Sequence, residues 1–241
     1  MNLLVDVGNT RTKYIFQDND KESLVSTIEN SHLNESWMTN SFKGVSRCVL
    51  SNVRHNAITN MFDNWSKENS IELRVVNSER NQHGVTTNYD NPESLGVDRW
   101  LALIGAKSIF PNENILIVDS GTATTVDVLT AQGEHLGGWI LPGIELMTKS
   151  IVGAASKVQA TPKIINSLNF ASNTSDAVNN ASYVATIGLI EQAKALCEKS
   201  RIKLDRIVLS GGSAESILDL IALDAIHVPN IVFEGLKKYI V

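Results

Sequence analysis

Apolar and polar positions along the chain recur with two periods, one typical of strands and one typical of helices. In the first half, short apolar or alternating runs predict strands at residues 3–7, 11–17, 24–28, 47–53 and 72–76. Helical spacing in the same half predicts helices at residues 35–39, 57–69 and 97–110. The polar stretch 77–92 has little periodicity and several turn formers, so we expect a loop over the cleft there.

The pattern starts again after Pro111-Asn112, where the last of these helices should end. Strands are predicted at 115–119, 124–129, 135–141 and 206–210, long helices at 143–155 and 175–199, and a short helix and a strand–helix pair at the end. Three strands followed by a helix and a strand occur twice, which indicates duplicated α/β domains with mixed sheets. We expect domains at 1–112 and 113–241, and this length is sufficient for two small cores.

A similar turn follows the first strand of each half. The first copy reads Asp6-Val-Gly8-Asn9-Thr10, and the second reads Asp119-Ser-Gly121-Thr122. Glycine lets the backbone approach a ligand closely, hydroxyl and N–H groups donate to oxyanions, and the aspartate can hold a cation or a water. One copy alone is equally well explained as an ordinary hairpin, because these are turn residues. Two copies in matching context favour a cleft that binds a nucleoside triphosphate from both sides.

Composition excludes several classes of function. Hydrophobic residues make up 43% of the chain and charged residues 20%, as in globular proteins that are soluble in water. No apolar run approaches the roughly 18–20 residues that span a membrane, and the chain begins directly with a strand, so we expect a cytoplasmic protein. The net charge is −5 and there is no block of Lys and Arg, which argues against nucleic acid as a partner.

Cysteine and histidine give no sign of a metal centre. Cys48 and Cys197 stand apart in apolar or helical patterns, so we expect buried free thiols rather than a disulfide or a zinc site. The histidines are scattered and are expected at the surface or satisfied in the core: His32, His55, His83, His135 and His227.

Four phrases carry a family resemblance. They are Asp6-Val-Gly8-Asn9-Thr10 with Lys13, Tyr89-x-x-Pro92-x-x-Leu95-Gly96-Val97-Asp98-Arg99, Asp119-x-Gly121-Thr122-Ala-x-Thr125-x-Asp127, and Gly137-Gly138-x-Ile140-x-Pro142-Gly143. In this order they resemble the first phosphate loop, the substrate motif, the second phosphate loop and the following segment of type III pantothenate kinases. That family belongs to the acetate kinase/sugar kinase/Hsp70/actin superfamily, and the resemblance runs nearly from end to end.

The resemblance implies a fold and a reaction. The fold is two ribonuclease H-like (actin-like ATPase) domains with the nucleotide between them. The reaction is transfer of the γ-phosphoryl group of ATP to pantothenate, which gives 4'-phosphopantothenate, in the first step of coenzyme A biosynthesis. The implied ATP-binding residues are Asp6, Gly8, Asn9, Thr10, Lys13, Gly121 and Thr122, and the implied pantothenate-binding residues are Tyr89, Gly96, Val97, Asp98, Arg99 and Thr174.

The resemblance also implies cofactors and a partner. Magnesium would accompany ATP, and Asp119 would bind a monovalent cation, potassium or ammonium. By this resemblance the protein would be a homodimer, as members of the family are. The threonine before the long helix, here Thr174, would reach the pantothenate bound by the partner subunit. Relatives usually carry a Ser-Gly pair later in that helix, where this chain has Asn180-Ala181.

The residues support the same chemistry independently of the family. The acceptor hydroxyl needs a carboxylate as its general base, and Asp98 at a helix start is the best candidate. Arg99 can pair with an anionic substrate. Structural alternatives stay open: Asp98 and Thr174 as helix caps, Arg99, Lys13 and Tyr89 as surface residues, and Gly211-Gly212 as either an adenosine loop or a plain turn.

Two other functions remain open at this point. One is a different small-molecule kinase or a phosphatase of the same superfamily. The other is a non-catalytic accessory factor for transcription, although the acidic net charge of −5 and the lack of a helix-turn-helix weigh against direct contact with DNA. A P-loop or a dinucleotide-binding fingerprint is not present in the sequence.

Overall fold

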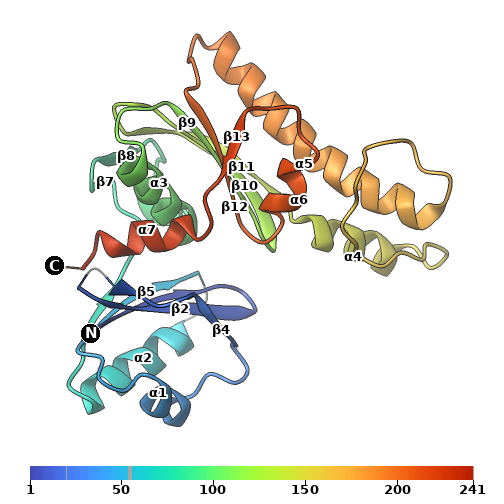
Figure 1. Cartoon of the computed structure of the whole chain (residues 1–241). Helices are drawn as coiled ribbons and strands as arrows, with labels where there is room; N and C mark the ends of the chain where they lie inside the picture. Colours follow the sequence, from blue (N-terminus) through green and yellow to red (C-terminus); the bar gives the residue numbers. More distant parts are fainter. Residues whose placement is uncertain (20, 54–55, 241) are drawn as a thin grey trace. The chain divides into compact units, whose positions relative to one another are not determined.

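The computed structural model describes residues 1–19, 21–53 and 56–240, apart from the side chain of residue 56. The chain forms two compact units, each with its own sheet (Figure 1). Unit 1 consists of Met1–Gly84, Tyr89–Ile109 and Ile231–Val241. Unit 2 consists of Val85–Asn88 and Phe110–Asn230. The expected division lies between residues 112 and 113. In the structure, Val85–Asn88 belong to the second unit and Ile231–Val241 belong to the first. The expected domain division itself stays a prediction.

The sheet of unit 1 has the strand order β3-β2-β1-β5-β6, and β4 also pairs with β2. Its strands are β1 (Asn2–Val7), β2 (Arg11–Asp18), β3 (Lys21–Glu22), β4 (Ser26–Glu29), β5 (Arg47–Asn52) and β6 (Glu72–Val75). β1 and β2 form an antiparallel hairpin, while β5 lies parallel to both β1 and β6. Strand β7 (Asn81–Gln82) follows later in the same unit.

Alternation along β1 separates the two faces of this sheet. Leu3, Val5 and Val7 pack in a core with α1 (Glu35–Ser41) and α2 (Asn56–Glu68), which contributes Phe62 and Trp65. α1 begins where the Asn34 side chain accepts a hydrogen bond from the Trp37 N–H at 2.9 Å. Asp6 therefore belongs to the opposite face, on the side of the sheet away from α1 and α2.

That opposite face is covered by two helices that cross at very short range, α3 (Val97–Ile109) and α7 (Ile231–Lys237). A Cβ built on Gly105 would stand 2.3 Å from the Ile231 carbonyl oxygen. A Cβ built on Gly235 would stand 2.1 Å from the Leu101 carbonyl oxygen. Only glycine at both positions allows this contact between the two backbones.

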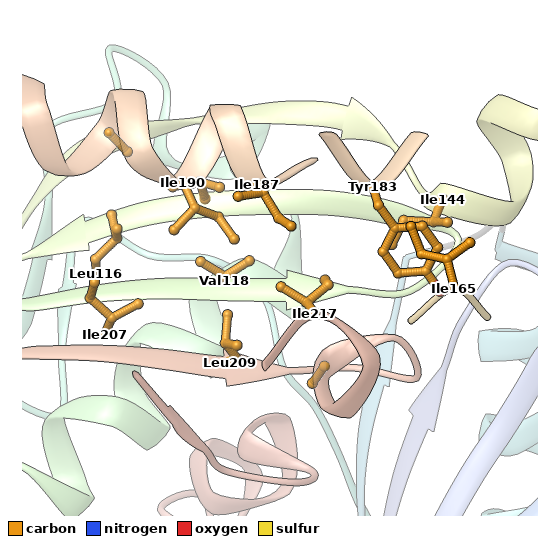
Figure 2. Close-up of a cluster of buried hydrophobic side chains, with 13 residues drawn as sticks. Leu116, Val118, Ile144, Ile165, Tyr183, Ile187, Ile190, Ile207, Leu209 and Ile217 are labelled. Atoms are coloured by element: carbon orange, nitrogen blue, oxygen red, sulfur yellow. The ribbon is translucent and has the colours of Figure 1, made fainter. Parts of the chain in front are cut away.

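The strands of unit 2 lie in the order β13-β12-β9-β10-β11-β8. They are β8 (Val85–Thr87), β9 (Ile115–Ser120), β10 (Ala123–Leu129), β11 (Glu134–Pro142), β12 (Arg206–Ser210) and β13 (Ala225–His227). One face carries α4 (Ile144–Ala154), α5 (Thr174–Lys199) and α6 (Ala214–Leu218). Figure 2 shows Ile187 and Ile190 of α5 above Leu116 and Val118 of β9, in the core that the helices seal.

The predicted elements are present with small shifts at their ends, and one expectation is wrong. The stretch 77–92 is not a plain loop, because it contains β7 and β8 and ends at the first residue of the short helix η1 (Pro92–Ser94). β8 pairs in parallel with β11, with Thr87 opposite His135. Strand β8 consists of only three β-branched residues between turn formers, and a pattern of this length does not indicate a strand. Within the described residues, no helix is both long and apolar enough to cross a membrane.

Candidate active site

The first phosphate-type turn is the tip of the β1–β2 hairpin. The Gly8 N–H donates to the Arg11 carbonyl at 3.0 Å and closes the turn. Asp6 stands at the end of β1, where the buried Ser51 hydroxyl donates to its Oδ1 at 3.0 Å. Lys13 lies directly opposite Asp6 in the register of the hairpin and is exposed. Opposed residues share a face of the sheet, so the ammonium and the carboxylate stand on the same side.

Asn30, the residue after β4, forms hydrogen bonds to two backbone carbonyls of this tip. Its side-chain Nδ2 donates to the Gly8 carbonyl at 2.9 Å, and its backbone N–H donates to the Thr10 carbonyl at 3.0 Å. The hydroxyl of Thr12, which is fully buried, donates to Asn30 Oδ1 at 2.8 Å. Asn30 is not predicted from the sequence, because one polar residue at a strand end gives no indication of what it contacts.

The second phosphate-type turn joins β9 to β10. The Gly121 N–H donates to the Ala123 carbonyl at 2.9 Å, and the Ser120 and Thr124 hydroxyls lie 2.9 Å apart beneath the tip. The Thr122 carbonyl accepts from the Gly143 N–H at 2.9 Å, just before α4 begins. The Gly137–Gly143 phrase therefore contributes a direct support of the second tip.

The Gly211 turn lies against the same place. Gly211 has a φ of +86°, and a Cβ there would stand 2.4 Å from Asp119 Oδ1 and 2.5 Å from the Ser120 carbonyl oxygen. The Ser213 N–H donates to that same carbonyl at 3.0 Å. A glycine is thus required both by the backbone angle and by the close approach. The turn that the sequence left open is packed against the carboxylate of Asp119.

The substrate motif ends in a buried arginine. Arg99 is 6% exposed, and its Nη1 donates to the Tyr89 hydroxyl at 2.8 Å. The Arg99 guanidinium carbon also lies 5.6 Å from the centre of the Tyr89 ring. The surface alternative for Arg99 is therefore wrong, while Tyr89 is half-buried and held by Arg99.

Asp98 occupies the first turn of α3 and is partly buried. Its Oδ1 accepts from the Arg99 N–H at 2.8 Å, while the Trp100 N–H donates to the Gly96 carbonyl at 3.0 Å. Asp98 does therefore contribute to the helix start, as the structural alternative proposed. This hydrogen bond uses Oδ1 and orients the carboxylate, which is compatible with a general base as well as with a helix cap. The catalytic role of Asp98 therefore stays a prediction.

Thr174 is the first residue of α5 and is exposed. The cap of α5 is Asn173, whose Oδ1 accepts from the Asp176 N–H at 2.9 Å. The alternative that Thr174 merely caps its own helix is therefore wrong. A hydrogen bond from Lys163, with a further one from Asn173, lowers the pKa of Asp176 and keeps this first turn charged.

Three buried polar side chains in unit 2, those of Thr87, His135 and Asp127, form a hydrogen-bonded chain. His135 Nδ1 lies 3.0 Å from the Thr87 hydroxyl, and His135 Nε2 lies 2.8 Å from Asp127 Oδ1. All three residues are buried, so His135 is the satisfied core histidine that the sequence predicted. The order hydroxyl–imidazole–carboxylate resembles a hydrolase triad, but a substrate cannot reach it. Of the five histidines, His55 lies outside the described residues.

Both cysteines are buried and free, as expected. Burial raises the pKa of the Cys48 thiol far above its usual range, and burial together with Glu198 raises the pKa of Cys197. Neither thiol is therefore a ready nucleophile. Among residues 1–19, 21–53 and 56–240, no cluster of three or more His, Cys, Asp or Glu residues that could hold a metal is found.

Comparison with known proteins identifies the family. A model of the type III pantothenate kinase family matches residues 2–195. The chain is also 38% identical over 249 aligned residues to a protein of Colwellia psychrerythraea named "Type III pantothenate kinase", covering 99% of this chain and all of that one. The chain belongs to the type III pantothenate kinase family. The family predicted from the four sequence phrases is therefore confirmed.

Solved structures agree on the fold. One is a Campylobacter jejuni protein described as a conserved putative Baf family transcriptional activator, with a TM-score of 0.60 and 22% identity over 99% of this chain and 96% of that one. Another is a putative 2-dehydro-3-deoxygalactonokinase from Sinorhizobium meliloti, with a TM-score of 0.60 and 11% identity over 98% of this chain and 97% of that one. At such identities these likenesses show the fold alone. The predicted class, two mixed α/β sheets of the actin-like ATPase and sugar kinase type, is confirmed.

Proposed function

We propose that this member of the pantothenate kinase family transfers the γ-phosphoryl group of ATP to the primary hydroxyl of pantothenate. The observation that carries the proposal is the first turn of α3. A partly buried carboxylate, Asp98, is followed there by a buried guanidinium, Arg99, which Tyr89 holds in place at 2.8 Å. One group can take a proton and the other can bind an anion, and both are fixed before substrate arrives.

The proposed step uses these groups as follows. Arg99 pairs with the carboxylate of pantothenate, and Tyr89, Gly96 and Val97 line the same part of its site. The pantothenate hydroxyl oxygen attacks the γ-phosphorus, Asp98 accepts the hydroxyl proton, and ADP leaves. The carboxylate thus makes the oxygen more nucleophilic as the new phosphorus–oxygen bond forms.

ATP would be bound by the backbone and hydroxyl groups of both turns. Gly8, Asn9 and Thr10 supply the first set and Gly121 and Thr122 the second, with Asp6 and Lys13 beside the first tip. The side-chain oxygen atoms near the tips include the carboxylates of Asp6 and Asp119, which suit hard cations such as magnesium and potassium. Magnesium, when bound to ATP, would neutralise part of the phosphate charge. We assign a monovalent cation to Asp119, because a carboxylate repels polyphosphate unless a cation lies between them.

The proposal includes a homodimer. Because Asn173 caps α5, Thr174 is not needed there and is available to the partner's pantothenate. The exposed side of α5 carries small or apolar residues that suit close contact with a second helix, namely Ala181, Val184, Ala185 and Gly188. Asn180, where relatives differ, donates to the Asn169 carbonyl at 2.8 Å within the same chain. A cytoplasmic location completes the proposal, since the reaction consumes ATP that cells hold there.

The test is ADP release by the purified protein, measured with and without pantothenate in a coupled assay. We expect release to depend on pantothenate, and the product to be its phosphate ester. Asp98→Asn keeps the shape of the side chain but not its basicity, so kcat should fall by about 10²–10⁴-fold while pantothenate still binds. A panel of sugars and other alcohols in the same assay would instead identify a different acceptor, and near-normal turnover by Asp98→Asn would remove the base assignment.

A further inference from the structure

The tip of the β1–β2 hairpin has its carbonyl groups tied to one residue outside the hairpin. The Gly8 carbonyl accepts from Asn30 Nδ2 at 2.9 Å, and the Thr10 carbonyl accepts from the Asn30 backbone N–H at 3.0 Å. The Asn30 amide cannot easily turn over, because its Oδ1 is held by the hydroxyl of Thr12 at 2.8 Å. Thr12 is fully buried and Asn30 is half-buried, so the hydroxyl end of this contact is shielded from water.

The direction of these carbonyls determines the direction of the neighbouring N–H groups. In a planar trans peptide, the C=O of one residue and the N–H of the next point in opposite directions. The described chain contains no cis peptide bond. The Gly8 carbonyl points toward Asn30, so the Asn9 N–H points away from it. The Arg11 carbonyl accepts from the Gly8 N–H inside the hairpin, so the outward donor fixed by this geometry is the Asn9 N–H.

This arrangement suits an anion. Carbonyl oxygens carry partial negative charge and repel phosphate, whereas a backbone N–H carries partial positive charge and attracts it. By binding the Gly8 carbonyl, Asn30 leaves the Asn9 N–H as a donor on the other side of the tip. An unrestrained tip rich in glycine and asparagine could place a carbonyl there instead, since such residues adopt many backbone angles.

We propose that Asn30 is a positioning residue for ATP, which holds the first phosphate turn in its donor-outward conformation without touching the nucleotide. This inference rests on the proposed function of the turn as an ATP site. Both ends of the amide are needed, because Nδ2 must donate to Gly8 and Oδ1 must accept from Thr12. Neither aspartate nor alanine can replace it.

The experiment measures binding of a non-hydrolysable ATP analogue with magnesium by calorimetry, using the full chain. We expect Asn30→Ala to raise the dissociation constant about tenfold, which corresponds to the loss of one or two neutral hydrogen bonds. Asn30→Asp should weaken binding further, because its carboxylate faces a carbonyl and adds negative charge near the phosphates. Thr12→Val, which frees the amide but keeps its shape, should give a smaller rise. In steady state, KM for ATP should rise while KM for pantothenate changes less than about twofold.

The matched control is Asn34→Ala. Like Asn30, Asn34 is an asparagine that bonds a backbone group, here the Trp37 N–H, but it is exposed, caps α1 and does not contact the turn. It should lose stability without losing affinity for the analogue. Equal weakening by Asn34→Ala would assign the effect to general destabilisation and overturn the proposal. So would unchanged binding by Asn30→Ala or, if that variant does not fold, by Thr12→Val.

The same data separate this inference from the proposed reaction. A wild-type protein that binds the analogue but releases no ADP with pantothenate would refute the reaction, while the comparison of Asn30→Ala with Asn34→Ala would still decide the role of Asn30. A wild-type protein that binds no analogue would overturn the inference itself.

Discussion

The crossing of α3 and α7 makes a quantitative prediction for Gly235→Ala. The new Cβ would stand 2.1 Å from the Leu101 carbonyl oxygen, 2.8 Å from its carbon and 2.9 Å from the Leu101 Cα. Ordinary carbon contacts need about 3.5 Å, so the helices must separate by roughly 1 Å or more. All three obstacles are backbone atoms and cannot rotate away. Overpacking of this kind destabilises a protein by about 1–3 kcal/mol, and we expect a value in the upper part of that range. The higher helix propensity of alanine offsets up to about 1 kcal/mol of this loss.

The net expectation is therefore a loss of about 2 kcal/mol in the free energy of unfolding of unit 1. Urea unfolding followed by tryptophan fluorescence suits the measurement, because Trp37, Trp65 and Trp100 lie in unit 1 and only Trp139 lies in unit 2. Gly153→Ala in α4 is the matched control, since a Cβ there meets nothing within 4 Å. It should be neutral or stabilise by about 0.4–1 kcal/mol. A Gly235→Ala protein as stable as wild type would refute the close-crossing argument.

Three further predictions concern pH, the cation and the dimer. Burial, partly offset by the hydrogen bond from Trp100, raises the pKa of Tyr239 above its usual value, so its contribution to stability should be complete below about pH 10 and lost as the pH rises further; Tyr239→Phe should show a smaller alkaline loss in unfolding measurements between pH 9 and 11. Activity should require potassium or ammonium and fall sharply in sodium alone, and an Asp119→Ala protein with an unchanged potassium response would place the cation elsewhere. Mixed Asp98→Asn and Thr174→Trp chains should recover activity, because one site of the heterodimer keeps both native residues; demonstrated heterodimers without activity would exclude a shared site.

The parts of the fold with local signals were predictable from the sequence. The two hairpins follow from apolar runs around Asp-x-Gly turns, and α3 follows from its helical spacing. The family and the placement of Asp98 at a helix start followed from phrases of adjacent residues. All of these depend on neighbours within one or two turns of the chain.

The remaining features depend on contacts between distant residues. β8 is a strand because Thr87 lies opposite His135, and Asn30 matters because it meets Gly8, 22 residues earlier. The membership of α7 in unit 1 depends on Gly105 and Gly235, which are far apart in the sequence. Local periodicity contains no information about these pairings, and single glycines or asparagines are as common in ordinary loops.

The late position of α7 affects how the protein emerges from the ribosome. About 120 residues separate the end of α3 from the start of α7, which at roughly 5–20 residues per second is a delay of about 6–24 s. During that time the nascent α3 lacks the helix that Leu101 and Gly105 contact in the finished protein, where Leu101 is fully buried. Chaperones that bind exposed apolar segments would therefore find this helix accessible throughout that time. A messenger RNA with a stop codon before residue 231 would yield a chain whose N-terminal unit lacks α7 and cannot complete its fold.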